Sequence, residues 1–491
     1  MHGKVAHELG RQIVAGDLRE GALLPREAEL SETYRVSRQA VREALKVLAA
    51  KGLVVTRRRT GSLVASRALW NLLDPDVIAW HGHVGVNADF LCDLVAFRLL
   101  LEPKAAALAA EHATAGQIEQ IREAIEEMRR NVDDRTAFAE ADARFHVAVF
   151  AASGNSLIDR LSTIIAPLLE IGATVPSSVE ANPAWAAGRH DRVLMAIAGR
   201  DAEVAQATMS EVLAVYLAGN DSRRPADAKA GDSGDDDTSE IPSLGQREPS
   251  AVGGLYPSQP LHGRVAHAIG ARIVSGVFRE GSTLPREAEF AAEYKVSRQA
   301  VREALKVLAA KGLVSTRRRA GTSVASRADW NLLDPDVVAW HQPQDLPRDF
   351  LRELGELRRV VEPAAAAIAA ERRNAAQMER ISEAIAAMRR ASTPAGWAIA
   401  DVEFHMAVAA ATGNMLIGSF GRTLAPLLEA SIRERSEVAS AAILAINRHA
   451  VIAEAIRRRD HEAARKAMVA MLDLADRQFS QSAAGGLRQP A

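Results

Sequence analysis

The sequence has almost no cysteine, few aromatic residues and no long apolar run. Its 491 residues include one cysteine, Cys92, so no disulfide can form within the chain, and we expect a cytoplasmic protein. No apolar stretch approaches the ~20 residues that span a bilayer, and the first residues do not read as a secretory signal. Only 4% of the residues are aromatic, and the net charge is −1. A charge this small leaves nucleic-acid binding open, because the charge that matters for it is local.

The most informative feature of the sequence is a repeat. The stretch VSRQAVREALKVLAAKGLV occupies residues 36–54 and recurs unchanged at 296–314. The similarity continues through WNLLDPDV, which begins at Trp70 and again at Trp330. A period of 260 residues is far too long for a solenoid repeat. The length suggests about three or four domains, and the repeat indicates a duplicated protein that has several domains per copy.

Each copy changes character once along its length. Short helical patterns and a hairpin come first, and long alanine- and leucine-rich helical patterns follow. We therefore predict a mainly α fold, with two tandem copies of a small α/β winged helix-turn-helix domain, each followed by an all-α bundle. The predicted segments are winged domain 1–69, connector 70–85, helical domain 86–218, linker 219–259, winged domain 260–329, connector 330–345, helical domain 346–480 and disordered tail 481–491.

The linker is rich in Asp, Ser, Gly and Pro, which cannot build a core. About 40 such residues have a root-mean-square span of roughly 35 Å, which would let the two copies pack side by side.

Two short helices in each copy have the layout of a helix-turn-helix. Pro25 is suited to the first turn of one helix, Ser37 to the N-cap of the next, and Gly52 to its end. Along the second helix the residues Val41, Ala44, Leu45 and Leu48 share one face, and the opposite face carries Arg38, Gln39, Arg42 and Lys46. Arginine can bond guanine and glutamine can bond adenine in the major groove. This pattern predicts a DNA recognition helix, although a charged helix face is more often simply solvated.

A basic hairpin follows the recognition helix. In LVVTRRRTGSLVA two β-branched runs flank Arg57, Arg58 and Arg59 before Gly61. A hairpin with a basic tip is suited to lie along phosphates or to enter a minor groove. We therefore expect the arginines of the hairpin to contact DNA.

The stretch LPREAELSETYRVSRQAVREALKVLAAKGLV resembles the winged-helix domain of GntR-type transcriptional regulators. The later FRLLLEP and DARFH motifs resemble the FadR-like branch, which has an all-helical FCD effector domain. The resemblance covers nearly everything except the linker, and it implies double-stranded operator DNA as a partner and dimerisation. The predicted DNA contacts are Arg26, Ser37, Arg38, Gln39, Arg42, Arg57, Arg58, Arg59 and Gly61, with Arg286, Ser297, Arg298, Gln299, Arg302, Arg317, Arg318, Arg319 and Gly321 in the second copy.

An aspartate and two histidines recur in the helical part of each copy. Asp142 and His146 are four residues apart and share a helix face, and His190 lies on a later helix. The second copy has Asp401, His405 and His449. Such side chains can bind Zn²⁺ or another divalent ion, but a lone Asp/His pair is more often an ordinary hydrogen-bonded pair.

The resemblance implies a metal ion in each helical domain. It also places a fourth ligand where this sequence has Val212 and Met471, so a metal here would have three protein ligands. The open positions could accept a carboxylate effector.

Arg98 and Arg358 stand four residues before Glu102 and Glu362. From the spacing alone this is a helix-surface ion pair. The resemblance instead implies an arginine that faces the cavity and binds a carboxylate effector such as a sugar acid. Two further positions suggest that the pockets differ between the copies: Glu403 replaces Arg144, and Arg359 replaces Leu99. His83 and His112 have no counterparts, and we expect them at the surface.

Three functions remain open at this point. The leading hypothesis is a transcriptional regulator, a repressor controlled by a small carboxylate, which is not an enzyme and acts as an intramolecular pseudo-dimer or a homodimer. The second is a metal-dependent hydrolase fused to a DNA-targeting module, against which no general base or nucleophile motif accompanies the Asp/His pair. The third is a non-specific nucleoid-type DNA-binding protein.

Overall fold

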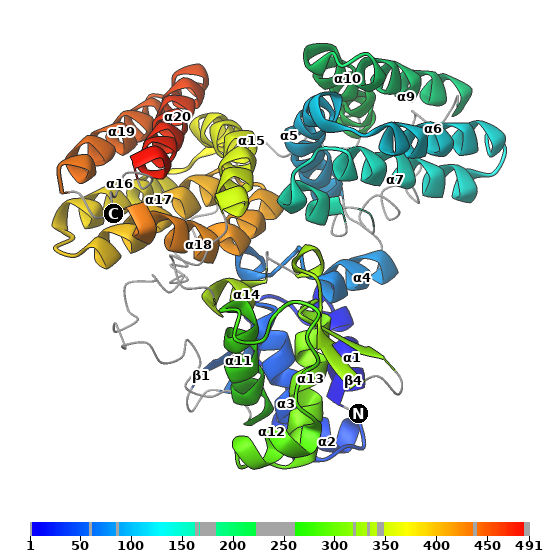
Figure 1. The fold of residues 1–491 in the computed structure, drawn as a ribbon, viewed down its shortest axis with the longest axis vertical. Helices are drawn as coiled ribbons and strands as arrows, with labels where there is room; N and C mark the ends of the chain where they lie inside the picture. The colour runs from blue at the N-terminus through cyan, green and yellow to red at the C-terminus, as the bar shows by residue number, and fades with distance from the viewer. Residues whose placement is uncertain are drawn as a thin grey trace, which may run out of the picture. The chain divides into compact units, whose positions relative to one another are not determined.

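The computed structural model describes residues 2–57, 61–84, 88–162, 166, 183–221, 261–317, 321–330, 334–340, 348–435 and 439–485 (Figure 1). The chain divides into two compact units. Unit 1 holds Met1–Ile241 together with Ala409–Phe420, and unit 2 holds Pro242–Val408 and Gly421–Ala491. No helix in the described part of the chain is long and apolar enough to cross a membrane.

The first winged domain consists of three helices and a hairpin. Its elements are α1 His2–Ala15, α2 Glu27–Thr33, α3 Arg38–Ala50, β1 Val54–Arg57 and β2 Gly61–Val64. The Ser37 hydroxyl accepts a hydrogen bond from the Ala40 amide, as expected of an N-cap, and Gly52 takes a positive φ of 75° directly after the helix. Helix α2 begins two residues after Pro25, with Arg26 as its N-cap residue. The predicted helix-turn-helix and hairpin are confirmed, with this small shift in the first helix.

The second winged domain repeats the first. Its elements are α11 Leu261–Val274, α12 Glu287–Glu293, α13 Arg298–Ala310, β3 Val314–Arg317 and β4 Gly321–Val324. In each domain the two strands pair antiparallel. The predicted apolar face of the recognition helix is buried in both copies, as Val41, Ala44, Leu45, Leu48 and their counterparts Val301, Ala304, Leu305, Leu308.

A short connector follows each hairpin. In the first copy it contains η1 Arg67–Leu69 and α4 Pro75–Val84, and in the second η4 Arg327–Asp329 and α14 Pro335–Trp340. Trp330, Val337 and Trp340 belong to the same hydrophobic core as the second winged domain. In the first copy α4 packs against α1. Each connector helix is therefore packed on the winged domain that precedes it.

The rest of each copy is helical, as predicted. The first helical domain contains α5 Ala88–His112, α6 Ala115–Arg130, α7 Arg135–Ala151, α9 Pro183–Ala198 and α10 Ala202–Asp221. Helix α5 packs against α7, α9 and α10, and α6 against α7 and α9 (Figure 1). Thr114 and Asp134 cap α6 and α7 with their side chains.

The second helical domain follows the same order. It contains α15 Arg348–Arg372, α16 Ala375–Arg390, α17 Pro394–Ala411, α18 Met415–Arg435, α19 Ala439–Arg457 and α20 His461–Gly485. Helix α15 packs against α19 and α20, and α16 packs against α19. In both domains the Asp/His pair on α7 or α17 is buried.

Candidate functional site

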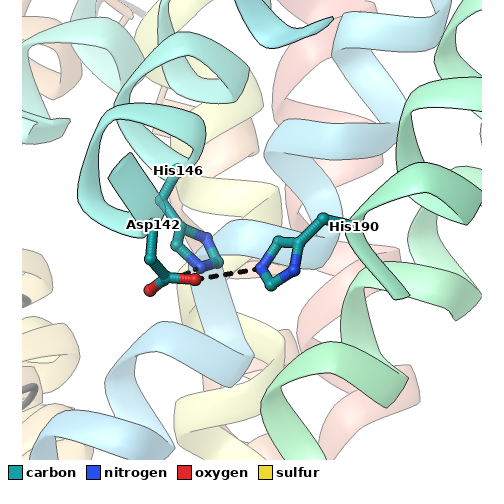
Figure 2. Close-up of side chains that lie close together, drawn as sticks. All are labelled: Asp142, His146 and His190. Atoms are coloured by element: carbon teal, nitrogen blue, oxygen red, sulfur yellow. Dashed lines mark ion pairs between the residues drawn. The ribbon is translucent and has the colours of Figure 1, made fainter. Parts of the chain in front are cut away.

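The three predicted ligand residues of the first copy meet inside the helical domain. Helix α7 supplies Asp142 and His146, and α9 supplies His190 (Figure 2). Asp142 Oδ1 lies 3.1 Å from His190 Nε2, and Asp142 Oδ2 lies 3.7 Å from His146 Nε2. All three side chains are buried, and one ligand atom from each lies within 4.8 Å of the others. Asp142 and His146, four residues apart on α7, therefore both face the buried His190 of α9.

Helix α5 adds an arginine and a glutamate to this cluster. Arg98 Nε donates to Glu102 Oε1 at 2.6 Å, and Arg98 Nη2 lies 3.0 Å from His146 Nε2. The second oxygen of Glu102 lies 2.6 Å from His146 Nδ1. Only 5% of Arg98 and 1% of Glu102 is exposed, so the helix-surface interpretation of this pair is wrong.

The charges of the cluster fix the state of its carboxylates. Burial by itself raises the pKa of Glu102, but the nearby Arg98 and His146 outweigh it and lower that pKa to about 2. The pKa of Asp142 is also lowered, because His146, His190 and Arg98 offset its burial. Both carboxylates are therefore ionised at neutral pH.

The second copy repeats the arrangement. Asp401 Oδ1 lies 3.0 Å from His449 Nε2, and Asp401 Oδ2 lies 3.6 Å from His405 Nε2. Arg358 Nε donates to Glu362 Oε1 at 2.6 Å, and Glu362 Oε2 lies 3.0 Å from His405 Nδ1. Burial is again outweighed by Arg358 and His405, which lower the pKa of Glu362 to about 2. The two sites are chemically alike.

The donor set fits a divalent cation. Two histidines and an aspartate in each cluster are side chains that bind zinc in proteins. Glu102 contacts Nδ1 of His146, so that Nε2 faces Asp142, as carboxylates do when they orient metal-bound histidines. The position of the implied fourth ligand is apolar and buried, at Val212 and Met471. Arg98 shares Nε2 of His146 with any ion that binds there, so a metal would have to displace that contact.

The predicted difference between the two pockets is not found at Arg144. Its guanidinium forms an exposed ion pair with Glu127 at 2.8 Å, outside the buried cluster. Arg359, which replaces Leu99, is half-buried beside Arg358 on α15. His112 is exposed, as expected, and the side chain of His83 lies outside the described residues.

The recognition helices present the predicted polar residues to solvent. Arg38, Gln39, Arg42 and Lys46 are exposed on α3. Arg42 Nε bonds Glu27 at 2.7 Å, which ties the recognition helix to the start of α2, next to exposed Arg26. Arg302 and Glu287 form the same pair in the second copy. Contact with DNA would exchange these ion pairs for phosphate or base contacts.

The hairpin tips remain a prediction. Arg58, Arg59, Arg318 and Arg319 lie outside the described residues, as do the side chains of Arg57 and Arg317. Gly61 and Gly321 begin the second strand of each hairpin with positive φ angles of 102° and 86°, which glycine adopts without steric cost.

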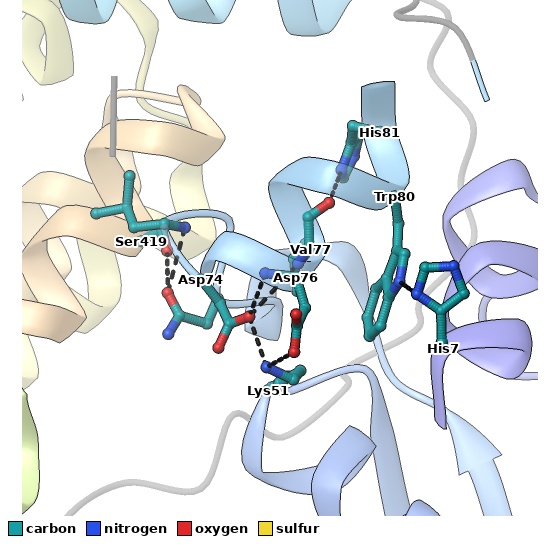
Figure 3. Close-up of polar contacts among 10 residues, drawn as sticks. His7, Lys51, Asp74, Asp76, Val77, Trp80, His81 and Ser419 are labelled. Atoms are coloured by element: carbon teal, nitrogen blue, oxygen red, sulfur yellow. Dashed lines mark hydrogen bonds and ion pairs between the residues drawn. The ribbon is translucent and has the colours of Figure 1, made fainter. Parts of the chain in front are cut away.

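The sequence analysis missed a network that joins each connector to its winged domain, which Figure 3 shows for the first copy. Lys51, at the end of α3, lies 2.6 Å from Asp74 and 2.8 Å from Asp76. Trp80 Nε1 donates to His7 Nδ1 at 2.9 Å. The signal was present in the repeated WNLLDPDV stretch, whose two aspartates recur with Lys311 in the second copy.

Glycine lets the connector approach the winged domain closely. A Cβ added at Gly10 would lie 2.4 Å from the Trp80 ring, and one added at Gly270 would lie 2.5 Å from the Trp340 ring. The connector helix and its winged domain therefore form one packed body in each copy.

Two winged helix-turn-helix domains with exposed basic recognition helices, each followed by a helical domain with a buried polar cluster, define a DNA-binding regulator with sensor domains. Residues 2–64 and 261–324 match the bacterial regulatory proteins of the gntR family. Residues 93–215 and 353–474 match the FCD domain. The chain belongs to this family of transcriptional regulators, as its resemblance predicted, and carries both domains in tandem.

The chain is similar to several single-copy regulators. It is 40% identical over 165 residues to the galactonate operon transcriptional repressor of Escherichia coli K12, covering 34% of this chain and 72% of that protein. It is 30% identical over 204 residues to the regulator LutR of Bacillus subtilis 168, covering 40% and 89%. It is 30% identical over 233 residues to the repressor NanR of Citrobacter rodentium, covering 45% and 87%. Each relative therefore corresponds to about one copy.

Proposed function

We propose that this chain is a repressor that holds an operator with its two winged domains and releases it when a small carboxylate, a sugar acid, binds the buried clusters. The name of one relative refers to a galactonate operon, and galactonate is a sugar acid. The observation that carries the proposal is the buried arginine beside three possible metal ligands. This arrangement suits an anionic ligand better than a neutral one.

The charges of the cluster support a carboxylate with a metal ion. Asp142 and Glu102 contribute two negative charges and Arg98 one positive charge, and a histidine that binds a metal ion does so in its neutral form. A divalent ion held by Asp142, His146 and His190 would leave one positive charge in excess. Such an ion supplies electrophilic binding positions for oxygen ligands. A monocarboxylate would then bring the buried site to neutrality, which lowers the cost of burying it.

The DNA side of the proposal depends on the duplicated recognition helix. Residues 37–39 and 297–299 are the same Ser-Arg-Gln, so the two winged domains should prefer the same half-site sequence. Two such heads suit a two-fold operator.

The test is an operator-release titration with individual sugar acids, D-galactonate among them, at fixed salt. The unmodified chain should lose operator affinity, and the variant with Asp142→Asn and Asp401→Asn should keep the same affinity without responding. The matched control is Asp191→Asn together with Asp460→Asn, two substitutions outside the buried clusters. If no sugar acid changes the affinity of the unmodified chain, this proposal for the effector is wrong.

A non-specific DNA-binding protein is the alternative, and affinity measured over a range of salt concentrations and DNA sequences separates it from a specific regulator. Non-specific binding is dominated by phosphate contacts, so its affinity falls steeply with salt and hardly depends on sequence. We expect a preferred sequence with two similar half-sites instead. A hydrolase is disfavoured because Arg98 and His146 already hold the two oxygens of Glu102, the carboxylate next to the ligand set, so it is not free to act as a general base.

A further inference from the structure

One segment of the second helical domain belongs to unit 1. Residues Ala409–Phe420 cover the end of α17, the following turn and the start of α18, and they group with the first copy. In the turn, Asn414 Nδ2 donates to the Asp93 carbonyl at 2.9 Å, and the Met415 amide donates to Asp93 Oδ2 at 2.8 Å. Asp93 lies near the start of α5 in the first copy. The backbone and the side chain of Asp93 therefore both accept hydrogen bonds from this turn.

The same segment contacts the first connector. The Leu72 amide donates to Ser419 Oγ at 3.0 Å, and Ser419 Oγ donates to Asn71 Oδ1 at 3.4 Å (Figure 3). Leu72 and Ser419 are both buried, so an amide left without this acceptor would be costly. The segment therefore touches the connector that is packed on the first winged domain.

An aromatic pair completes the contact. The rings of Phe97 and Phe420 lie 5.7 Å apart at 62°, edge to face, and both side chains are fully buried. Rings in this geometry attract each other beyond the area that they bury.

The repeat offers an independent argument for this pairing. The counterpart of Phe97 in the second copy is Leu357, and the counterpart of Phe420 in the first copy is Leu161. Pairing across the copies therefore gives Phe with Phe and Leu with Leu. Pairing within each copy would give two mixed pairs. The matched sizes are what close packing across the copies requires.

We propose that Ala409–Phe420 is a built-in docking segment by which the second helical domain holds α5 and the connector of the first copy. One chain is then a complete two-headed regulator and needs no second chain. Because α17 also carries Asp401 and His405, the buried cluster of the second copy is linked to the first winged domain through a single helix and its turn. The counterpart of Ser419 in the first copy is Arg160, so the side chain at this position of the contact differs between the copies.

A regulatory role for the link to the connector rests on the proposed function. The contact itself can be tested without DNA or effector. In a Cys92→Ser background, the full chain receives Asp93→Cys with Met415→Cys and is treated with a short bismaleimide. The matched control is Asp93→Cys with Ser156→Cys, because Ser156 is the counterpart of Met415 in the first copy. Peptide mass spectrometry identifies which cysteines are joined, and light scattering gives the mass.

We expect the first pair to be joined within a particle of 52.7 kDa, with a yield that stays constant on about tenfold dilution. The control pair should remain unjoined. A cross-linked product of twice that mass would overturn the proposal, as would cross-linking of the control pair or of neither pair.

A second measurement avoids cysteine variants. Amide hydrogen exchange of the connector peptide that contains Leu72 should be faster in Ser419→Ala, by up to about tenfold. The control is Ser382→Ala, which removes a hydroxyl bonded only within α16, to the Met378 carbonyl. Equal exchange in both variants would contradict the contact between Ser419 and the connector. Failure of the operator-release titration with these results intact would refute the effector proposal and leave the docking segment standing.

Discussion

The two winged domains differ in one row of residues across their small sheets. In the first copy the β-paired residues Leu23, Leu63 and Val55 form an apolar row. Leu23 in this row is 57% exposed. In the second copy the same row is polar and consists of Thr283, Ser323 and Ser315. The recognition helices, in contrast, have the same sequence, the same serine N-cap and the same ion pair to α2. The recognition helix is therefore the same in the two copies, whereas the row across the sheet differs between them.

The helical domains show the same division. Their buried clusters are alike, and the differences that we expected between the pockets lie partly at the surface, as with Arg144. The paired differences at Phe97 and Phe420 lie in the docking contact instead. The exposed polar residues of the recognition helix and the residues of the buried cluster are shared between the copies, whereas Phe97 and Phe420 of the docking contact are not.

The largest expected effect tests the likeness of the two buried clusters. Arg98→Ala leaves Glu102 as a buried charge without its main partner, and we expect a loss of about 3–5 kcal/mol in the free energy of unfolding. Arg358→Ala should cost a similar amount in the second copy. Urea denaturation measures both.

The control for these variants is Arg144→Ala. Its ion pair is half exposed, so the loss should be less than about 1 kcal/mol. If all three substitutions cost the same, the buried network does not stabilise the helical domains as described.

The next effect tests the identity of the recognition helices. Arg38→Ala and Arg298→Ala should each weaken operator binding by the same amount, about 1–3 kcal/mol, because each would remove one predicted bidentate base contact. Together they should abolish specific binding. Fluorescence anisotropy at fixed salt measures this, with Arg122→Ala on α6 as control. If the two single substitutions weakened binding by different amounts, the two winged domains would not recognise their half-sites in the same way.

A smaller effect tests the joint between connector and winged domain. Gly10→Ala brings a methyl group against the Trp80 ring, and we expect a loss of about 1–3 kcal/mol from overpacking. Gly3→Ala is the matched control on the same helix, because an added Cβ there meets nothing within 4 Å. It should stabilise α1 slightly through helix propensity. A stabilising Gly10→Ala would mean that the connector is not held against α1.

The smallest effect concerns the row that differs between the sheets. Replacing Leu23, Leu63 and Val55 with the Thr, Ser and Ser of the second copy should change the free energy of unfolding by less than about 0.5 kcal/mol for the exposed positions. Light scattering should show less self-association, because apolar area is removed from the surface. A large loss of stability would show that the row is covered in the folded protein.

Local patterns predicted much of this fold because their causes are local. Ser37 as N-cap, Gly52 after the helix, and the apolar face at Val41 and Leu45 all follow from spacing along one helix. The sequence identified Asp142, His146 and His190 as the candidate metal ligands, partly through the family resemblance. The contact between Glu102 and His146 was not, because it joins helices 44 positions apart and has no periodic signature.

The sequence by itself determined the duplicated architecture, the family and the residues of the recognition helix, since these depend on repeats and on helix periodicity. Only the tertiary structure decided that Arg98 is buried, that Lys51 and Trp80 join the connector to the winged domain, and that Ala409–Phe420 lies with the first copy. Such contacts form between segments far apart in the chain, where burial and close packing select the partners.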